Sequence, residues 1–261
     1  DPNWGQVAFD KGHILGAVHA DMDRHLATKP NQHGRHPLPP PQAWLAQIQA
    51  WGIENRDQII IYDDAGGSFA GRAWWMMRWL GHANVAVLDG GLNNWPGPLT
   101  KPGNSAQIYA PSTFQVTTPL TKLSSTEDVL TLSTTLMDAT NLGNEFLIDA
   151  RAQARFVGKK EPVDPVAGHI PGAVCLPFSD NLDDKGFFKT SDKLAQRFTD
   201  LGLSAAQQDI AVTVYCGSGV TAIHNILAMR IAGFGEAALY ADSWSGWILD
   251  AYRPVATGLD H

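Results

Sequence analysis

The stretch VTVYCGSGVTAIHN, residues 212–225, decides the fold of this chain. Its first four residues are apolar or β-branched, which is typical of a buried strand, and its last residues are typical of a helix. Between them lie Cys216 and the glycine-containing turn 217–220. A strand that leads through a short turn into a helix is a building unit of parallel α/β sheets.

The chain repeats itself, because three segments of its first half recur in the same order in its second half. GHILGAV at 12–18 recurs as GHIPGAV at 168–174. IIIYDDAGGSFAGRAWW at 59–75 corresponds to VTVYCGSGVTAIHNI at 212–226, and DGGLNNW at 89–95 corresponds to ADSWSGW at 241–247. The spacing is also kept: 50 residues separate Gly12 from Tyr62, and 47 separate Gly168 from Tyr215. A period this long indicates two copies of one domain.

We therefore expect an N-terminal domain over residues 1–110, a linker over 111–123 and a C-terminal domain over 124–261. The region between the copies is rich in Pro, Ser and Thr, as linkers often are. FLIDAR precedes GHIPG by about twenty residues, whereas eleven residues precede GHILG. We expect that the first copy lacks its opening strand and that residues before Asp1 have been removed.

Short apolar runs alternate with longer amphipathic segments. The second half is predicted to hold strands at 145–150, 173–177, 210–216 and 237–241, and helices at 191–203 and 221–235, the first helix opened by a Ser/Asp cap. This alternation predicts an α/β fold with two tandem domains, each a mainly parallel sheet flanked by helices. Tryptophans at helical spacing in RAWWMMRWLGH, residues 72–82, predict core and domain-interface packing.

Composition excludes several classes of function. The chain has 261 residues, of which 44% are hydrophobic and 17% charged, and a net charge of −7. Residues 1–123 hold 9 basic and 9 acidic side chains, whereas residues 124–261 hold 10 and 17. No basic stripe favours nucleic acid, and no apolar stretch reaches membrane-spanning length. The two cysteines form no disulfide framework, so we expect a reducing, cytoplasmic setting.

The turn after Cys216 suits a reactive sulfur. Gly217 and Gly219 let the backbone curl, and the turn aims backbone N–H groups and the start of a helix at one point. Such donors favour a thiolate or a persulfide, Cys–S–S⁻. A lone cysteine is more often part of the core, but the glycine turn and the helix start favour reactivity here.

The first copy provides a comparison, since aligning Tyr62 with Tyr215 places Asp63 at the position of Cys216. A carboxylate cannot accept sulfur, so we expect the first copy to be inactive. Two other cysteine chemistries fail. A tyrosine-phosphatase-type loop needs an arginine six residues after the cysteine, where this chain has Ala222, and a C-x-x-C redox motif needs a second cysteine where it has Gly219.

Together, the duplicated domains and the motifs GHIPGA, CGSGVTA and SWSGW resemble the two-domain rhodanese/mercaptopyruvate sulfurtransferase family over essentially the whole chain. The resemblance implies a C-terminal catalytic domain. The sequence contains no G-x-G-x-x-G or Walker pattern, so we expect no cofactor. The family resemblance also implies that Cys216 takes sulfane sulfur from a small anionic donor and passes it, as a persulfide, to a thiol or cyanide. Glycine and serine after the cysteine resemble mercaptopyruvate enzymes, whereas thiosulfate enzymes carry basic residues there.

The resemblance also implies roles for individual residues. Arg155, before Phe156, would bind the anionic donor, helped by the turn residues Gly217, Gly219, Val220 and Thr221. Ser218, His36 and Asp23 match a proposed proton-handling group, although each histidine of that polar loop read alone is simply solvated.

Three basic or thiol positions call for separate interpretation. Mercaptopyruvate enzymes carry a second donor-binding arginine a little further along the chain, where this sequence offers only Lys159 and Lys160. We interpret Arg151 as part of a structural ion pair and Cys175 as a core residue.

The sequence thus predicts a sulfurtransferase that favours 3-mercaptopyruvate, with thioredoxin or glutathione as possible acceptors. Two alternatives stay open at this point: a thiosulfate:cyanide sulfurtransferase of the same fold, and a non-catalytic persulfide carrier.

Overall fold

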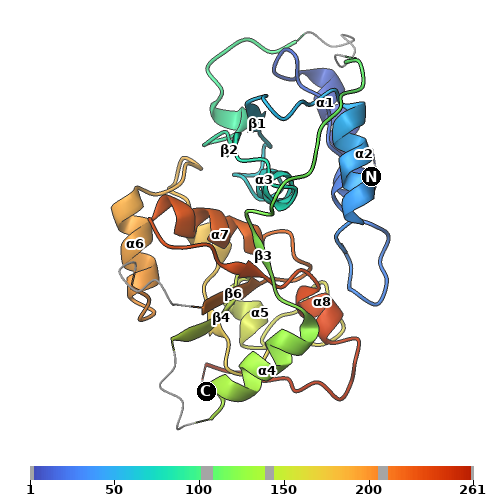
Figure 1. Ribbon diagram of the computed structural model, residues 1–261. Coiled ribbons are helices and arrows are strands. Elements are labelled where there is room, and N and C mark those ends of the chain that lie inside the picture. Colours follow the sequence, from blue (N-terminus) through green and yellow to red (C-terminus); the bar gives the residue numbers. More distant parts are fainter. Residues whose placement is uncertain (1–2, 101–107, 139–143, 205–210, 260–261) are drawn as a thin grey trace.

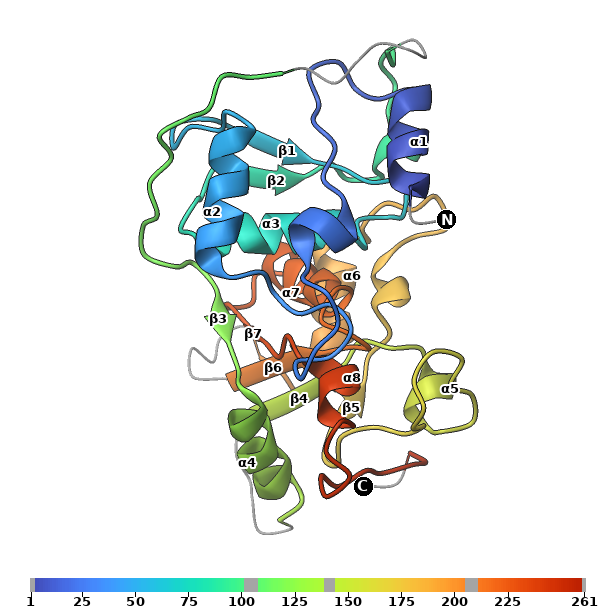
Figure 2. The ribbon, with the colours of Figure 1, turned by 90° about the vertical axis from the view of Figure 1, so that its right-hand side faces the viewer.

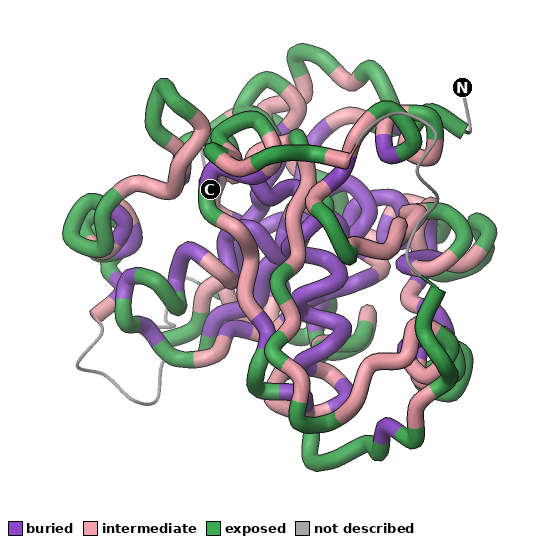
Figure 3. Tube along the Cα trace, turned by 90° about the horizontal axis from the view of Figure 1, so that it is seen from above, coloured by how far each residue is buried: buried purple, intermediate pink, exposed green. Residues whose placement is uncertain are grey.

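The computed structural model describes residues 3–100, 108–138, 144–204 and 211–259. The first half of the chain forms the upper unit in Figure 1 and the second half forms the lower one. An extended segment of the chain runs from the upper unit to the lower one and leads into strand β3 (Lys122–Leu123). Seen from above, buried segments gather in the middle of the molecule and exposed segments surround them (Figure 3).

The second half is built on a five-stranded sheet with the order β3-β7-β6-β4-β5. Every strand pairing in it is parallel, as the alternation of strands and helices predicts. The last two residues of the predicted linker form β3 and pair with β7. The bounds of the other strands are β4 Glu145–Asp149, β5 Val174–Cys175, β6 Ala211–Tyr215 and β7 Ala238–Leu239.

Helices cover both faces of this sheet. On one face, Leu194 and Ile226 pack with Val214 in the larger apolar cluster, and on the other Val129 and Trp244 join the smaller one. The first pair lies on α6 (Ser191–Thr199) and α7 (Ala222–Ile231), and the second on α4 (Thr126–Leu136) and α8 (Ser243–Trp247). Two short helices, α5 (Gln153–Phe156) and the 3-10 helix η3 (Phe178–Asn181), follow β4 and β5.

The predicted cap of α6 is wrong. The helix begins at Ser191 with Thr190 as its N-cap, and no side chain caps its first turn. The Ser191 hydroxyl instead donates to the Ile231 carbonyl, near the end of α7. Ser191 lies inside α6, and its hydroxyl binds a free carbonyl at the end of α7. It therefore does not cap the first turn of α6.

The described residues of the first half form a two-stranded parallel sheet, β1 with β2. The expected absence of an opening strand concerns residues before Asp1 and stays a prediction. The elements of this half are α1 Trp4–Lys11, η1 Met22–Leu26, α2 Pro41–Ala50, β1 Ile59–Ile61, α3 Ala70–Trp79, β2 Val85–Val87 and η2 Leu92–Asn94.

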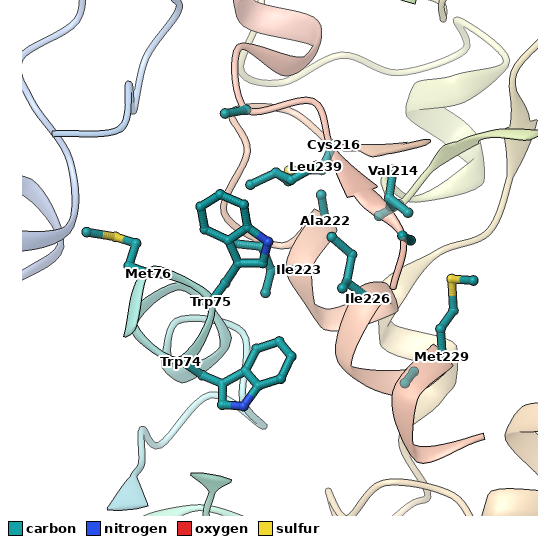
Figure 4. Packing of buried hydrophobic residues seen from close by; sticks show 14 of the residues in the cluster. Trp74, Trp75, Met76, Val214, Cys216, Ala222, Ile223, Ile226, Met229 and Leu239 are labelled. Carbon is teal, nitrogen blue, oxygen red and sulfur yellow. The ribbon is translucent and has the colours of Figure 1, made fainter. Parts of the chain in front are cut away.

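The two halves share one core at the contact between α3 and α7. Trp74 and Trp75 on α3 lie in the same apolar cluster as Ile223 and Ile226 on α7, and Figure 4 shows these side chains between the two helices. The helices approach closely because α3 carries Gly71, and a Cβ there would lie 3.5 Å from the Ile223 side chain. The prediction of core and interface packing for the tryptophans is confirmed for Trp74 and Trp75.

The internal duplication extends to individual contacts. The Tyr62 hydroxyl accepts a hydrogen bond from the Ile14 N–H at 3.1 Å, and the Tyr215 hydroxyl accepts one from Ile170 at 3.1 Å. The histidine of each GHI motif also stacks on a phenylalanine, at 3.7 Å in the first copy and 3.6 Å in the second. These matched contacts support the alignment of Tyr62 with Tyr215, and therefore of Asp63 with Cys216.

Candidate active site

Cys216 follows β6 at the carboxyl end of the sheet. β4 lies between β5 and β6, so β5 is added on one side of β4 and β6 on the other. Open α/β sheets bind their ligands at such a reversal of strand order. Cys216 is buried, with 1% of the residue exposed. The loops that follow β4 and β6 meet here, which brings residues of the DARAQARF segment beside the cysteine turn.

Three hydrogen bonds fix the cysteine turn to the beginning of α8. The Cys216 N–H donates to the Ser243 hydroxyl at 3.1 Å, and the Cys216 carbonyl accepts from the Trp244 N–H at 3.0 Å. The Gly217 carbonyl accepts from the Ser245 N–H at 2.9 Å. Gly219 has a φ of +76°, and a Cβ on it would lie 2.2 Å from the Ala241 carbonyl oxygen, so this position requires glycine.

Ser243 has an unusual backbone. It is the one non-glycine residue in the described ranges with a positive φ, +52°, and Gly91 holds the matching place in the first copy with +56°. The correspondence is supported by the Leu92 N–H, which donates to the Asp63 carbonyl as Trp244 donates to that of Cys216. A left-handed serine is strained, and here its hydroxyl accepts from the Cys216 N–H.

The first copy shows what such a turn can bind. The Asp63 carboxylate accepts four backbone hydrogen bonds, at 3.0, 2.8, 2.8 and 2.9 Å, from Ala65, Gly67, Phe69 and Ala70. The turn therefore closes around an anion. In the second copy, no acceptor among the described residues is recorded for the backbone N–H groups of 217–221. A negatively charged sulfur on Cys216 would lie in the corresponding place.

Ser218 and His36 form a pair across the contact between the two halves. His36 Nδ1 lies 2.7 Å from Ser218 Oγ, while His36 Nε2 lies 3.7 Å from a carboxylate oxygen of Asp23. Burial lowers the pKa of His36, against the opposing effect of Asp23. A neutral imidazole can accept the hydroxyl proton of Ser218, so this pair has the geometry of a proton relay. The Asp23 side chain is 75% exposed, so its contact with His36 is weaker than the contact between His36 and Ser218.

The two arginines after β4 have different surroundings. Arg151 is buried and binds the Asp149 carboxylate at 2.6 Å and the Gly168 carbonyl at 2.7 Å, which confirms its interpretation as a structural ion pair. Arg155 is half-buried and binds Glu161 at 2.9 Å and Asp164 at 2.8 Å. Its Nη1 atom would lie 3.3 Å from a Cβ on Gly217, so its guanidinium reaches the residue after the cysteine.

Sequence reasoning missed two arginines of the first half that contact this turn. Arg35 directly precedes His36, and its Nη2 atom would lie 2.9 Å from a Cβ on Gly217. Arg72, on α3, is fully buried and donates to the Gly219 carbonyl at 2.9 Å. Arg35 could have been found from its place beside His36, whereas Arg72 carries no local signal beyond an arginine within an apolar helix.

Cys175, the second cysteine, lies on a different strand from the cysteine turn. It lies on β5 against the smaller apolar cluster, and burial raises the pKa of its thiol to about 12. Both cysteines are free thiols. In the described ranges, no group of three or more His, Cys, Asp or Glu residues is arranged to hold a metal ion, and no helix is long and apolar enough to cross a membrane.

Comparison with known proteins places this geometry in a family. The model of the rhodanese-like domain matches residues 5–97 and 133–250, one match in each half. A Pseudomonas aeruginosa protein named "Probable 3-mercaptopyruvate sulfurtransferase" is 45% identical over 267 residues, covering 99% of this chain and 89% of its own. The thiosulfate sulfurtransferase of Cricetulus griseus is 32% identical over 255 residues, covering 93% and 80%.

A solved structure agrees with these relatives. SseA from Escherichia coli, described as a 3-mercaptopyruvate sulfotransferase with the rhodanese fold, superposes with a TM-score of 0.73 at 31% identity. The match covers 91% of this chain and 85% of SseA.

Proposed function

The chain belongs to the rhodanese-like family and is a sulfurtransferase, and on that premise we propose that it carries sulfur as a persulfide on Cys216 and prefers 3-mercaptopyruvate as the donor. The observation that carries the proposal is the pairing of Ser218 with His36 beside the cysteine turn, at 2.7 Å. This pair supplies the proton transfer that a mercaptopyruvate donor requires and that a thiosulfate donor does not.

In the proposed first half-reaction, the Cys216 thiolate attacks the sulfur of 3-mercaptopyruvate. The new S–S bond forms as the C–S bond breaks, and the electron pair of that bond moves into the enolate of pyruvate. Ser218 and His36 take the proton of the transferred sulfur and return it to the enolate carbon, which releases pyruvate and leaves Cys–S–S⁻. The backbone N–H groups of the turn stabilise this anion, as those of the first copy stabilise the Asp63 carboxylate.

In the second half-reaction, an acceptor thiolate attacks the outer sulfur. A new persulfide forms on the acceptor, the enzyme S–S bond breaks, and the electron pair returns to Cys216 as thiolate. We propose a small or protein thiol such as glutathione or thioredoxin as the acceptor, in a reducing cytoplasmic compartment where both free cysteines are stable.

The charge around the turn favours a monoanionic donor. Three arginines, at 35, 151 and 155, are matched by three carboxylates, at 149, 161 and 164, which bind them directly. Arg72, which donates to the Gly219 carbonyl, adds one cation without a carboxylate partner in the described ranges, so the excess of positive charge around the turn is small. A single carboxylate suits such a site, whereas the dianion thiosulfate would gain more from the basic turn residues that this chain lacks.

The test is a comparison of kcat/KM for 3-mercaptopyruvate and thiosulfate on one preparation with one thiol acceptor, with Cys216→Ser as the background control. We expect the higher value for 3-mercaptopyruvate. A higher value for thiosulfate would overturn the donor assignment and favour the second candidate, a thiosulfate sulfurtransferase, which is the name of the Cricetulus griseus relative. The persulfide on Cys216 would survive that result.

A further inference from the structure

We propose that His33 and Asp242, the pair called the clasp below, are positioning residues that hold His36 in its proton relay from across the contact between the halves. This inference rests on the proposed function and extends it, because it assigns the placement of the relay histidine to one contact between the two copies.

The chain before His36 forms a short hairpin. The Asn31 N–H donates to the Gly34 carbonyl at 3.1 Å, and the Gly34 N–H donates to the Asn31 carbonyl at 3.0 Å. The Asn31 side chain also accepts from the His33 N–H at 2.7 Å. Gly34 turns the chain with a φ of +95°, which suits glycine. His33 is therefore fixed within the hairpin, and the 33–36 segment carries its position to His36.

The His33 ring fastens this hairpin to the second half. Its Nδ1 atom donates to a carboxylate oxygen of Asp242 at 3.0 Å. The same oxygen accepts from the Thr126 hydroxyl at 3.1 Å, so α4 helps to fix the carboxylate. Gly34 permits the close approach, because a Cβ on it would lie 2.5 Å from the Ser245 hydroxyl oxygen. Figure 2 shows this blue segment descending from the upper unit to lie beside α8.

On the other side of the clasp, Asp242 directly precedes a residue that holds the reactive cysteine. This residue is Ser243, whose hydroxyl accepts from the Cys216 N–H at 3.1 Å. The contact between His33 and Asp242 therefore joins the segment that carries the relay histidine to the segment that fixes the cysteine turn.

The relay tolerates little displacement of His36. Its Nδ1 atom lies 2.7 Å from Ser218 Oγ, and proton transfer requires hydrogen-bond contact between the two groups. Two other contacts hold the same segment: the Arg35 N–H donates to a hydroxyl on α8, and Arg72 donates to the His36 carbonyl. Because both remain when the clasp is broken, we expect the relay to be weakened and the fold to persist.

The second half contacts the first copy in a matching way, which provides a control. Its hairpin, residues 183–188, lies on the segment 89–95, the counterpart of the segment that contains Asp242. The Asp89 carboxylate accepts from the Phe188 N–H of this hairpin at 2.8 Å. Asp89 therefore holds a hairpin of the opposite half, as Asp242 does, but beside the turn that lacks a cysteine.

The experiment compares His33→Ala, Asp242→Asn and Asp89→Asn in the full chain. The measurement is the single-turnover rate of persulfide formation at saturating donor. We expect each of the first two variants to slow the reaction with 3-mercaptopyruvate by about 3- to 10-fold, as the loss of one partly exposed hydrogen bond predicts. The rate with thiosulfate and the KM for 3-mercaptopyruvate should stay near the wild type, and Asp89→Asn should match the wild type with both donors.

Three further variants show whether the clasp acts as a pair and through His36. The double variant His33→Ala/Asp242→Asn should be no slower than either single variant. His33→Ala added to His36→Ala should cause no further loss. His33→Gln keeps an N–H donor for Asp242, so it should recover part of the rate, which a general loss of packing would not explain.

If His33→Ala slows both donors equally or neither, or if Asp89→Asn reproduces the loss specific to 3-mercaptopyruvate, the inference is overturned and the proposed function stands. Should Asp242→Asn fail to fold, His33→Ala carries the test, because the His33 side chain is half-exposed. If His36→Ala itself forms the persulfide from 3-mercaptopyruvate at the wild-type rate, the relay of the proposed function fails, and the clasp fails with it.

Discussion

Replacing Arg72 with methionine tests the contact that joins the first half to the cysteine turn. Arg72 is fully buried, and its guanidinium donates to three backbone carbonyls, those of Leu26, His36 and Gly219, at 3.1, 3.0 and 2.9 Å. No carboxylate pairs with it in the described ranges. Burial lowers the pKa of Arg72 to about 10, and a negative charge on Cys216 opposes that shift.

The magnitude follows from two opposed contributions. Three charge-assisted hydrogen bonds contribute about 1.5–3 kcal/mol each. Burying the cation costs about 3 kcal/mol, the equivalent of lowering its pKa to about 10. Methionine removes both contributions and leaves the three carbonyls unpaired. We therefore expect Arg72→Met to lower the free energy of unfolding by about 2–5 kcal/mol, or the melting temperature by about 5–15 °C.

The assay is urea denaturation, followed by the rate of persulfide formation in single turnover. Arg230→Met is the matched control, because Arg230 lies on α7 but is 40% exposed and should change stability by less than about 1 kcal/mol. Arg72→Lys should lie between the wild type and methionine, since one ammonium cannot reach three divergent carbonyls. Wild-type stability in Arg72→Met would refute this reasoning.

Three more predictions concern histidine and serine side chains near the contact between the halves. His36→Ala should reduce turnover of 3-mercaptopyruvate more than that of thiosulfate in steady-state assays, because sulfite leaves without a proton; an equal loss for both donors would contradict the proton relay. The His224 ring binds the Gly66 carbonyl at 3.0 Å, and burial lowers the pKa of His224 from 6.5 to about 4. Its contribution to the free energy of unfolding is therefore fully present above pH 6.5 and is lost as the pH falls toward 4. Denaturation at several pH values should show a loss of up to about 3 kcal/mol that His224→Gln lacks, and identical pH profiles would refute this assignment. Ser243→Ala should be less stable than Ser243→Gly by about 1 kcal/mol, because alanine keeps the left-handed strain that glycine avoids; thermal melts that rank them in reverse would contradict it.

Much of this molecule could be predicted from local patterns. Most of strand β6, the cysteine turn and the start of α7 lie within the fourteen residues 212–225, so hydrophobic periodicity and glycine placement were sufficient to predict them. The alternation of such units predicted the parallel sheet, and the repeated motifs predicted the duplication. These signals are short in range and appear twice, which is why they can be interpreted without a structure.

The residues that escaped prediction act over long distances in the sequence. Arg35 meets Asp164, 129 positions away, and Arg72 meets Gly219, 147 positions away. Neither contact leaves a periodic pattern, because only the packing of α3 against α7 and the docking of the 33–36 segment bring the partners together. The cap of α6 was mispredicted for a related reason, since the Ser191 hydroxyl binds another helix.

The most direct test of the account is to locate the sulfur itself. Wild-type protein treated with 3-mercaptopyruvate without acceptor should gain the mass of one sulfur atom, on the peptide that contains Cys216. Cys216→Ser should gain none and transfer no sulfur, whereas Cys175→Ser should behave like the wild type, because the Cys175 thiol, with a pKa of about 12, stays protonated. Sulfur found on Cys175, or substantial turnover by Cys216→Ser, would contradict the central claim.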